Sequence, residues 1–419
     1  MRISSSTVYD AGVLTMQQQA EALMKTQQQV ASGRRIVTPA DDPVGAARVL
    51  ELSQSKSINE QYGANNGTAG DSLSLEESVL GNITQLLQQA RDVTVSAGDP
   101  VLGRSDRASL ANELRSSYQQ LLGLANSTDG SGQYLFSGYR GTTRAFSETS
   151  PGVVRYNGDQ GQRLIQIGAS RQIPVSDAGD EVFQRIATGN GSFMTAAGGT
   201  NAGTAVIDAG TVVDPAKWAA SNGDFTIKFA VSGGATTYDI VDNANGDSLL
   251  TGNAAAAPPY PRSYTSGSAI DFSQVGPPAF DFGTHVNISG TPSDGDTFTI
   301  KPSANQDVFK TLDDLANLLQ NSNGGAALAN GLSGAQRNLD NAIDKVLSVR
   351  SSAGSRLKEL DAAKNAGDDQ SLQYSQTLSR LQDIDYAQAV SQLTQLQTNL
   401  EAAQKSFLKI TGLSLFSYL

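Results

Sequence analysis

The sequence predicts an α+β, multi-domain protein in which both chain ends form a long antiparallel helical bundle or coiled coil and an all-β domain is inserted between them. Three observations predict this arrangement: an apolar seam near the C-terminus, a matching seam near the N-terminus, and a change near Ala145 from helix-like to strand-like sequence. Apolar residues make up only 38 % of the chain and glycine contributes 42 residues. This composition favours slender helices and a Gly-rich β region over one compact enzyme body.

Both ends of the chain carry apolar residues at alternating steps of three and four, the 3.5-residue period of a coiled coil. The C-terminal seam consists of Tyr386, Ala389, Leu393, Leu396, Leu400, Ala403, Phe407 and Ile410. The N-terminal seam consists of Val13, Met16, Ala20, Leu23, Gln27 and Val30. Because a narrow stripe on a Gln/Ser/Thr-rich helix cannot stabilise that helix alone, we expect the two helices to pair.

The last seven residues extend the C-terminal seam with large apolar or aromatic side chains. A chain terminus is normally frayed and polar. An apolar terminus either docks on its own protein or contacts a neighbouring subunit, and finding both ends in this form favours assembly. The predicted oligomer interface therefore comprises Val13, Met16, Ala20, Leu23, Val30, Leu393, Leu396, Leu400, Ala403, Phe407, Ile410, Leu413, Leu415, Phe416 and Leu419.

The N-terminal third predicts three helices. The first spans residues 5–32 and is closed by a glycine at position 33. The second starts at residue 44, after Asp42 as N-cap and Pro43, and runs to about residue 97. Its three glycines at 63, 67 and 70 predict an irregular middle, and the wide apolar stripe that follows predicts two or more helical partners. The third helix is expected at about residues 106–125.

The connector before the second helix contains Arg34 and Arg35. This dibasic pair is either a binding spot or, more commonly, a solvated pair that balances nearby carboxylates such as Asp41 and Asp42. Farther on, residues 133–139 are expected to form a short strand that enters a hairpin.

The middle of the chain predicts strands. Residues 153–156 and 163–167 flank an Asn-Gly turn signal and are expected to form a hairpin. Further strands are expected at residues 204–213, 225–232, 236–241, 284–288 and 297–301. Helices resume at Asp307 with a short helix to about residue 320 and a long helix from residue 333, which should reach an irregular joint near residues 365–369 before the terminal helix.

The chemistry of the chain excludes several function classes. The net charge is −11, and residues 145–304 hold 15 Asp/Glu against 8 Lys/Arg, which argues against nucleic acid as a partner. The sequence contains no cysteine and no run of eighteen apolar residues, and its first residues lack an apolar h-region. We therefore expect no disulfides, no cleaved Sec-type signal and no membrane insertion. His285 has no second His or Cys to help bind a metal.

No motif predicts catalysis or a cofactor. The neighbouring carboxylates Glu76 and Glu77 should diverge on a helix rather than face one substrate. An acidic, Gly-containing loop at residues 242–247 lacks the full calcium-loop spacing, and Trp218 is expected in the core of the β domain rather than in a stacking platform. The sequence therefore predicts a structural protein, not an enzyme, with no cofactor or metal.

Several motifs resemble the flagellin superfamily. The run from Ser32 to Arg48 resembles its signature, and the version Thr38-Pro39-Ala-Asp41-Asp42-Pro43, with Met-Arg-Ile-Ser at the start, is similar to the hook-associated junction branch rather than to true flagellins. Residues 72–77, 122–126, 132–138, 347–350 and 413–419 fit the same superfamily. The resemblance covers roughly residues 1–140 and 305–419, while the middle domain varies.

This resemblance implies a flagellin-like layered fold. Residues 1–43 and 370–419 are expected as inner terminal coiled-coil helices, disordered in the monomer. Residues 44–144 and 305–369 are expected as the helical body, and residues 145–304 as a variable outer β-rich domain. It also implies secretion through the flagellar type III export apparatus, a cytoplasmic export chaperone on the C-terminal helix, and an extracellular place at the hook–filament junction. There the chain would contact itself, the first hook-associated protein and flagellin.

Two other functions stay open at this point. The chain could be a divergent flagellin that forms the filament itself. It could also be a surface adhesin whose acidic β domain binds a host or carbohydrate ligand, although no aromatic platform suggests it.

Overall fold

The computed structural model describes residues 5–221 and 223–412, which divide into two compact units. The first unit contains the described parts of residues 1–67, 166–171 and 361–419, and the second contains residues 68–165 and 172–360. The boundary falls within two long helices, α2 (Pro43–Ser96) and α7 (Gly325–Gln382). The predicted class, helical at both ends with a central β-rich region, is confirmed. The predicted three-part division stays a prediction.

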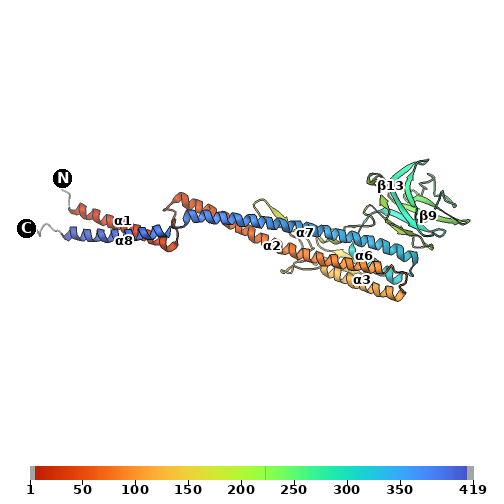
Figure 1. Ribbon diagram of the computed structural model, residues 1–419, viewed down its shortest axis with the longest axis horizontal. Coiled ribbons are helices and arrows are strands. Elements are labelled where there is room, and N and C mark those ends of the chain that lie inside the picture. The colour runs from red at the N-terminus through yellow and green to blue at the C-terminus, as the bar shows by residue number, and fades with distance from the viewer. Residues whose placement is uncertain (1–4, 222, 413–419) are drawn as a thin grey trace, which may run out of the picture. The chain divides into compact units, whose positions relative to one another are not determined.

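The terminal helices of the first unit are α1 (Ser5–Ser32) and α8 (Tyr386–Gly412), which lie side by side and antiparallel (Figure 1). The bounds of α1 are those expected from the sequence. Gly33 follows α1 with a φ of 69°, the left-handed conformation that ends helices and suits glycine. Helix α2 begins at Pro43, one residue before the expected start, and the Asp42 carboxylate accepts a hydrogen bond from the Gly45 N–H at 2.8 Å, as expected of an N-cap.

Two predicted irregularities in the long helices are wrong. Helix α7 begins at Gly325 and continues through residues 365–369, whose polar side chains are mostly exposed, so they need no break in the helix. The interruption lies instead at residues 383–385, where the Asp385 carboxylate accepts hydrogen bonds from the N–H groups of Ala387 and Gln388 and caps α8. The three glycines of α2 are helical, because tertiary packing outweighs their low propensity.

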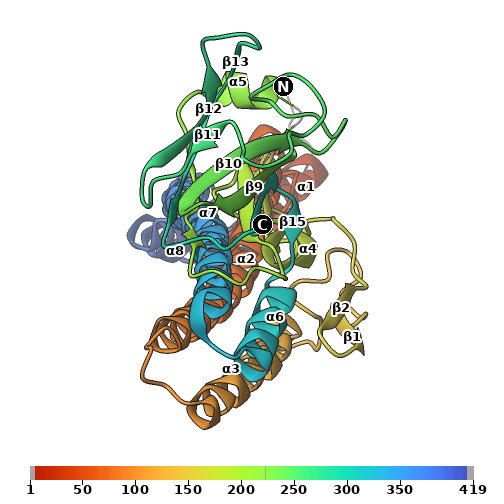
Figure 2. The same ribbon diagram turned by 90° about the vertical axis from the view of Figure 1, so that its right-hand side faces the viewer.

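The second unit contains a helical core. Helix α3 (Arg104–Ala125) lies along α6 (Val308–Asn321), as Figure 2 shows. Together with α2 and α7, and with the hairpin of β1 (Phe146–Ser150) and β2 (Val153–Tyr156), they bury one apolar cluster. The wide stripe on α2 therefore faces several partners, as the sequence predicted. Members of this core with no exposed side-chain surface include Leu80, Ile83, Leu87, Leu121, Phe136, Phe146, Phe183, Phe309 and Leu315.

The β domain of the second unit has a separate core between two sheets. The larger sheet has the order β11 (Arg262–Ser263), β10 (Ala235–Asp242), β9 (Phe225–Ser232), β14 (Thr297–Pro302) and β6 (Phe193–Ala197). The smaller sheet joins β12 (Ala269–Gln274), β13 (Phe280–Ser289) and β7 (Val206–Ile207), with β8 (Thr211–Val212) also on β13. Trp218, on the short helix α5 (Pro215–Ala220), lies in this core, as predicted.

The remaining elements are short. They are β3 (Leu164–Gln166), β4 (Gln172–Pro174), α4 (Gly179–Phe183), β5 (Ile186–Ala187) and β15 (Asn305–Gln306). The expected strand at residues 204–213 is split into β7 and β8. The expected strand at 284–288 is the C-terminal half of the longer β13.

Two predictions in the first β segment are wrong. Strand β2 pairs with β1 rather than with residues 163–167, because the turn at Pro151-Gly152, with Gly152 at a φ of 76°, connects neighbouring strands more tightly than the Asn-Gly loop. Strand β3 pairs with β4. Residues 133–139 form turns, not a strand, because Leu135 and Phe136 are buried side by side in the helical core, whereas a strand would alternate them between two faces.

Candidate assembly interface

The α1–α8 pair covers its apolar seam only by half. The predicted seam residues Val13, Met16, Ala20, Leu23 and Val30 on α1 are neither fully buried nor exposed. The same is true of the α8 residues Leu393, Leu396, Leu400, Ala403 and Phe407. Among the described side chains of these two helices, only Thr26 and Ala389 are buried. Two helices alone therefore leave the seam open to water on its flanks.

Some predicted seam positions differ or cannot be placed. Gln27 is exposed and the neighbouring Thr26 takes the buried position, because its hydroxyl donates to the Ala22 carbonyl at 3.0 Å and leaves its methyl group to pack. Tyr386 is 55 % exposed. The side chain of Ile410 and all of Leu413, Leu415, Phe416 and Leu419 lie outside the described residues.

The end of the pair nearest the termini is held by an aromatic contact. The ring centroids of Tyr9 and Phe407 are 5.2 Å apart, with a tilted geometry. Gly12 lies against the same ring, and a methyl group at Gly12 would come within 2.7 Å of Phe407 Cδ2. Gly12 is not among the predicted interface residues, because a single glycine inside a helical pattern gives no signal of a close approach.

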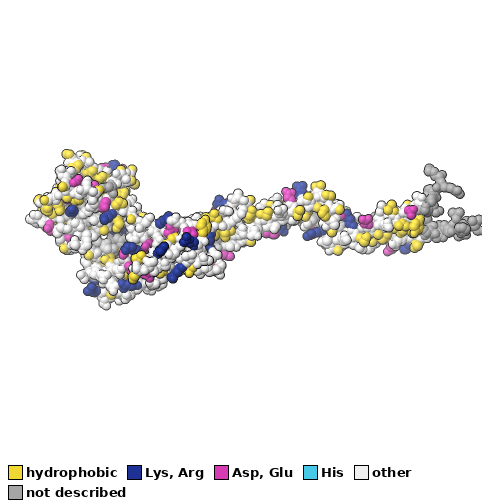
Figure 3. All heavy atoms as spheres, turned by 180° about the vertical axis from the view of Figure 1, so that it is seen from behind, with side chains coloured by type: hydrophobic (Ala, Val, Ile, Leu, Met, Phe, Trp, Pro, Cys, Tyr) yellow, Lys and Arg dark blue, Asp and Glu magenta, His cyan; other side chains and the backbone are white. Residues whose placement is uncertain are grey.

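Further apolar side chains on the pair point away from the seam. Leu14, Met24, Val390 and Leu408 are 56, 57, 49 and 69 % exposed. Figure 3 shows hydrophobic side chains along the end of the chain that adjoins the grey terminal residues, with charged groups between them. An exposed apolar surface of this kind is typical of a surface that contacts other subunits.

Helix α1 ends, and helix α8 begins, at a joint formed by residues 33–42 and 383–385. Arg34 and Asp383 form an isolated antiparallel β-bridge, and the Arg35 N–H donates to the Gln382 carbonyl at 2.6 Å. The Arg35 guanidinium donates to the Leu381 carbonyl at 2.8 Å and lies 3.7 Å from the Asp42 carboxylate. Arg35 thus balances Asp42 at the joint, in line with the charge-balancing interpretation, whereas Arg34 contributes its backbone bridge.

The signature residues organise this joint. The Asp41 carboxylate accepts hydrogen bonds from the N–H groups of Val37 and Thr38 at 3.0 and 2.8 Å, and it pairs with Lys25 at 2.7 Å. The hydrogen bond from Lys25 is the main reason that the pKa of Asp41 lies well below its usual range, with the Thr38 N–H second. Pro39 is exposed in the turn between these groups. The signature is therefore a turn that positions α2 after α1.

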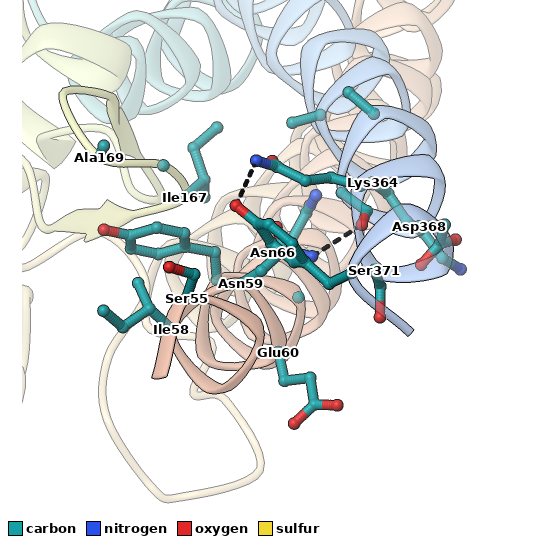
Figure 4. A pocket seen from close by; sticks show the side chains of 18 residues that line it. Ser55, Ile58, Asn59, Glu60, Asn66, Ile167, Ala169, Lys364, Asp368 and Ser371 are labelled. Atoms are coloured by element: carbon teal, nitrogen blue, oxygen red, sulfur yellow. Dashed lines mark hydrogen bonds between the residues drawn. The ribbon is translucent and has the colours of Figure 1, made fainter. Parts of the chain in front are cut away.

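A groove of about 710 Å³ lies in the first unit between α2, α7 and the turn at residues 167–169 (Figure 4). The Asn59 amide crosses it and donates to the Gly367 carbonyl at 2.7 Å. Lys364, Asp368 and Ser371 on α7 also line the groove.

Glu76 and Glu77 diverge, as the sequence predicted. Glu77 faces the Arg350 guanidinium at 2.6 Å, whereas Glu76 is buried beside Asp177. Across residues 5–221 and 223–412, no group of three or more His, Cys, Asp or Glu side chains could hold a metal ion. None of the helices in the described chain combines the length and apolarity that a membrane span requires.

Comparison with known proteins defines the class of this fold. Residues 3–141 match the bacterial flagellin N-terminal helical region, and residues 337–419 match the bacterial flagellin C-terminal helical region. The chain is thus a flagellin-type structural protein of the bacterial flagellum.

Longer matches identify the family. Flagellar hook-associated protein 3 of Escherichia coli is 28 % identical over 99 % of both chains, and that of Salmonella typhimurium is 26 % identical over the same share. The crystal structure of flagellar hook-associated protein 3 from Legionella pneumophila has a TM-score of 0.70 and 31 % identity, covering 80 % of this chain and 98 % of that chain. The chain belongs to the flagellar hook-associated protein 3 (FlgL) family.

Membership in this family decides between the open functions. A second structure from Legionella pneumophila, called the flagellar junction protein FlgL, has a TM-score of 0.68 and 31 % identity and covers 81 % of this chain and all of that chain. The chain is therefore a hook–filament junction adaptor. The filament-forming and adhesin alternatives are not favoured.

Proposed function

We propose that the chain polymerises through α1 and α8 between hook-associated protein 1 and the flagellin filament, outside the cell. The observation that carries this proposal is the half-covered seam of the α1–α8 pair. Copies placed side by side would cover the flanks of that seam, and the area removed from water would favour the assembly by about 25 cal/mol per Å². The oligomer interface is accordingly the set of seam residues on α1 and α8.

We further propose that assembly orders the terminal helices. A pair of helices with so few buried side chains offsets little of the ordering entropy, which is about 1–2 kcal/mol for each residue backbone. In the monomer these helices would be disordered, and additional partners in the ring would tip the balance toward the folded pair. This coupling keeps free chains from polymerising before they reach the flagellum.

Terminal helices that are disordered in the monomer also suit export and chaperone binding. A terminal segment without a stable fold can pass through the flagellar type III export apparatus as an extended chain. In the cytoplasm its apolar seam needs a cover, which a dedicated export chaperone on the C-terminal helix would provide. The helical body of residues 44–144 and 305–369 and the outer β domain of residues 145–304 would then fold after export.

A pair of neighbouring substitutions on α8 tests this proposal. Leu400 is a half-buried seam residue, whereas the next residue back, Asn399, is exposed. We expect Leu400→Asp to abolish incorporation into flagella, because it buries a charge in the seam. The matched control Asn399→Asp introduces the same charge and should incorporate normally. Equal incorporation of the two variants would contradict the proposal. Removal of Leu413–Leu419 should also abolish incorporation while the central body stays folded.

A further inference from the structure

Two buried acidic residues are in contact inside the second unit. Glu76 lies on α2 with 1 % of its surface exposed, and Asp177 precedes α4 with 6 % exposed. The Asp177 N–H donates to Glu76 Oε1 at 2.9 Å, which brings the two residues into direct contact across 101 positions of sequence. Residues 172–178, which we call the latch segment, are thereby tied to α2.

The nearby arginine side chains pair with residues other than Glu76. The Arg356 guanidinium of α7 donates to Asp177 Oδ1 at 2.8 Å, and the Gln162 amide donates to the same oxygen at 2.7 Å. Arg163 donates to the Gln133 side chain at 2.7 Å and lies 3.8 Å from Asp129. On α2 itself, Glu77 is paired with Arg350, and α7 adds Glu359 one turn beyond Arg356. Glu76 thus has no ion pair among the described residues.

One carboxylate oxygen of each residue lacks a hydrogen-bond partner among the described residues. Glu76 Oε2 and Asp177 Oδ2 are buried and have no hydrogen-bond partner in the described part of the chain. Two buried, adjacent negative charges are unfavourable, because each loses its hydration and repels the other. A proton on Glu76 removes one of the two charges.

We propose that Glu76 and Asp177 form a proton-controlled latch, which holds the latch segment on α2 while Glu76 is protonated and weakens when Glu76 ionises. Hydrogen bonds also connect the latch segment to the backbone of Arg163. The Val175 N–H donates to the Arg163 carbonyl, and the Arg163 N–H donates to the Ser176 hydroxyl. Opening the latch would let residues 172–178 move away together, with α4 anchored by the buried Val182 and Phe183.

The direction of the pH effect follows from the environment of Glu76. Burial raises the pKa of Glu76 to about 7 from its ordinary value of 4.5, with repulsion from Asp177 as the second cause. The positive charges of Arg356 and Arg163 oppose this rise but do not outweigh it. Because the pKa is raised in the closed state, the latch is tightest below about pH 4.5 and loosens as the pH rises toward 7.

Amide hydrogen exchange of the intact chain tests the latch. In the wild type, the opening equilibrium constant at Val175 and Asp177, corrected for intrinsic exchange, should rise by up to about tenfold per pH unit between about pH 4.5 and 7 and then level off. In Glu76→Gln, where the side chain stays neutral, this rise should vanish. Glu77→Gln, which changes a neighbouring carboxylate paired with Arg350, should keep it. A pH-independent opening in the wild type, or the same rise in Glu76→Gln, would overturn the proposal.

A second measurement keeps the test decisive if Glu76→Gln folds poorly. The carboxyl ¹³C resonance of Glu76 in the wild-type chain should titrate with a midpoint near pH 7. A midpoint near 4.5 would show that Glu76 is ionised at neutral pH and would refute the latch.

Discussion

The ring of Phe407 on α8 lies against the backbone of Gly12 on α1, so closely that a side chain at position 12 would meet Cδ2 and Cε2. We expect Gly12→Val to separate the two helices at this end, because overpacking costs about 1–3 kcal/mol. Incorporation into flagella should fall roughly 5- to 160-fold, as that energy implies. The control Gly63→Val lies on α2, where an added Cβ meets nothing within 4 Å, and it should incorporate normally. Equal losses would show that Gly12 has no special contact.

The joint offers a direct test of its own geometry. Arg34 and Asp383 are opposite each other in an antiparallel bridge, where Cα atoms are about 4.5–5.5 Å apart and suit a disulfide. Because the chain contains no cysteine, oxidation of Arg34→Cys/Asp383→Cys should give a single intramolecular crosslink, visible as a mobility shift on a denaturing gel. Arg34→Cys/Gln392→Cys places the second thiol on α8 beyond the joint and should crosslink poorly. Similar yields for both pairs would contradict the bridge.

Asp41 should make the joint sensitive to acid. Its pKa is lowered by the hydrogen bond from Lys25 and by the Thr38 N–H, so its contribution is complete above the ordinary value of 3.8 and is lost as the pH falls further. At pH 7, Asp41→Asn should speed hydrogen exchange at Val37 and Thr38, whose N–H groups donate to this carboxylate. The difference from the wild type should shrink in strong acid.

The control for this experiment is Glu60→Gln, which removes an exposed carboxylate 3.8 Å from Lys56 on the same unit. A surface pair of this kind contributes little, so exchange at the joint should not change. If Asp41→Asn also leaves both amides unaffected at pH 7, Asp41 does not hold the turn.

The β domain should depend on its aromatic core. Phe225 has no exposed surface, and its ring centroid lies 5.2 Å from that of Phe282 and 5.4 Å from that of Phe272. Phe225→Ala should lower the free energy of unfolding of this domain by about 3–5 kcal/mol, measured by the fluorescence of the single tryptophan, Trp218, during denaturation. Val275→Ala, at a fully exposed residue, should change it by less than about 0.5 kcal/mol. A loss of similar size in both would be inconsistent with this core.

Sequence periodicity predicts the terminal pair because the signal is local and repeats along each helix. The seam from Val13 to Val30 and from Leu393 to Phe407 lies on the half-buried positions. The period alone does not decide which of two neighbouring residues is buried, however. Thr26 is buried in place of Gln27, because a hydroxyl that bonds its own helix tolerates burial better than an amide. The predicted joint at residues 365–369 is wrong for a related reason. These polar residues resemble a break in the sequence, whereas the break lies at 383–385, where Asp385 caps α8 by hydrogen bonds to its backbone.

Contacts between distant segments were not predictable in this way. Nothing in the sequence indicates that Asp177 approaches Glu76, since the two are brought together only when residues 172–178 fold over α2. Likewise, the pairing of β2 with β1 depends on a turn at Gly152 that competes with an equally plausible turn signal at residues 157–162. The chemistry of single residues is local, but the choice of partner is set by the whole fold.

The most direct test of the junction role is immunogold labelling of isolated flagella with antibodies against the β domain, residues 145–304. We expect gold in one narrow band where the hook meets the filament, and loss of that band in Leu400→Asp but not in Asn399→Asp. Label along the whole filament, or no label on flagella at all, would contradict the proposed place of this chain at the junction.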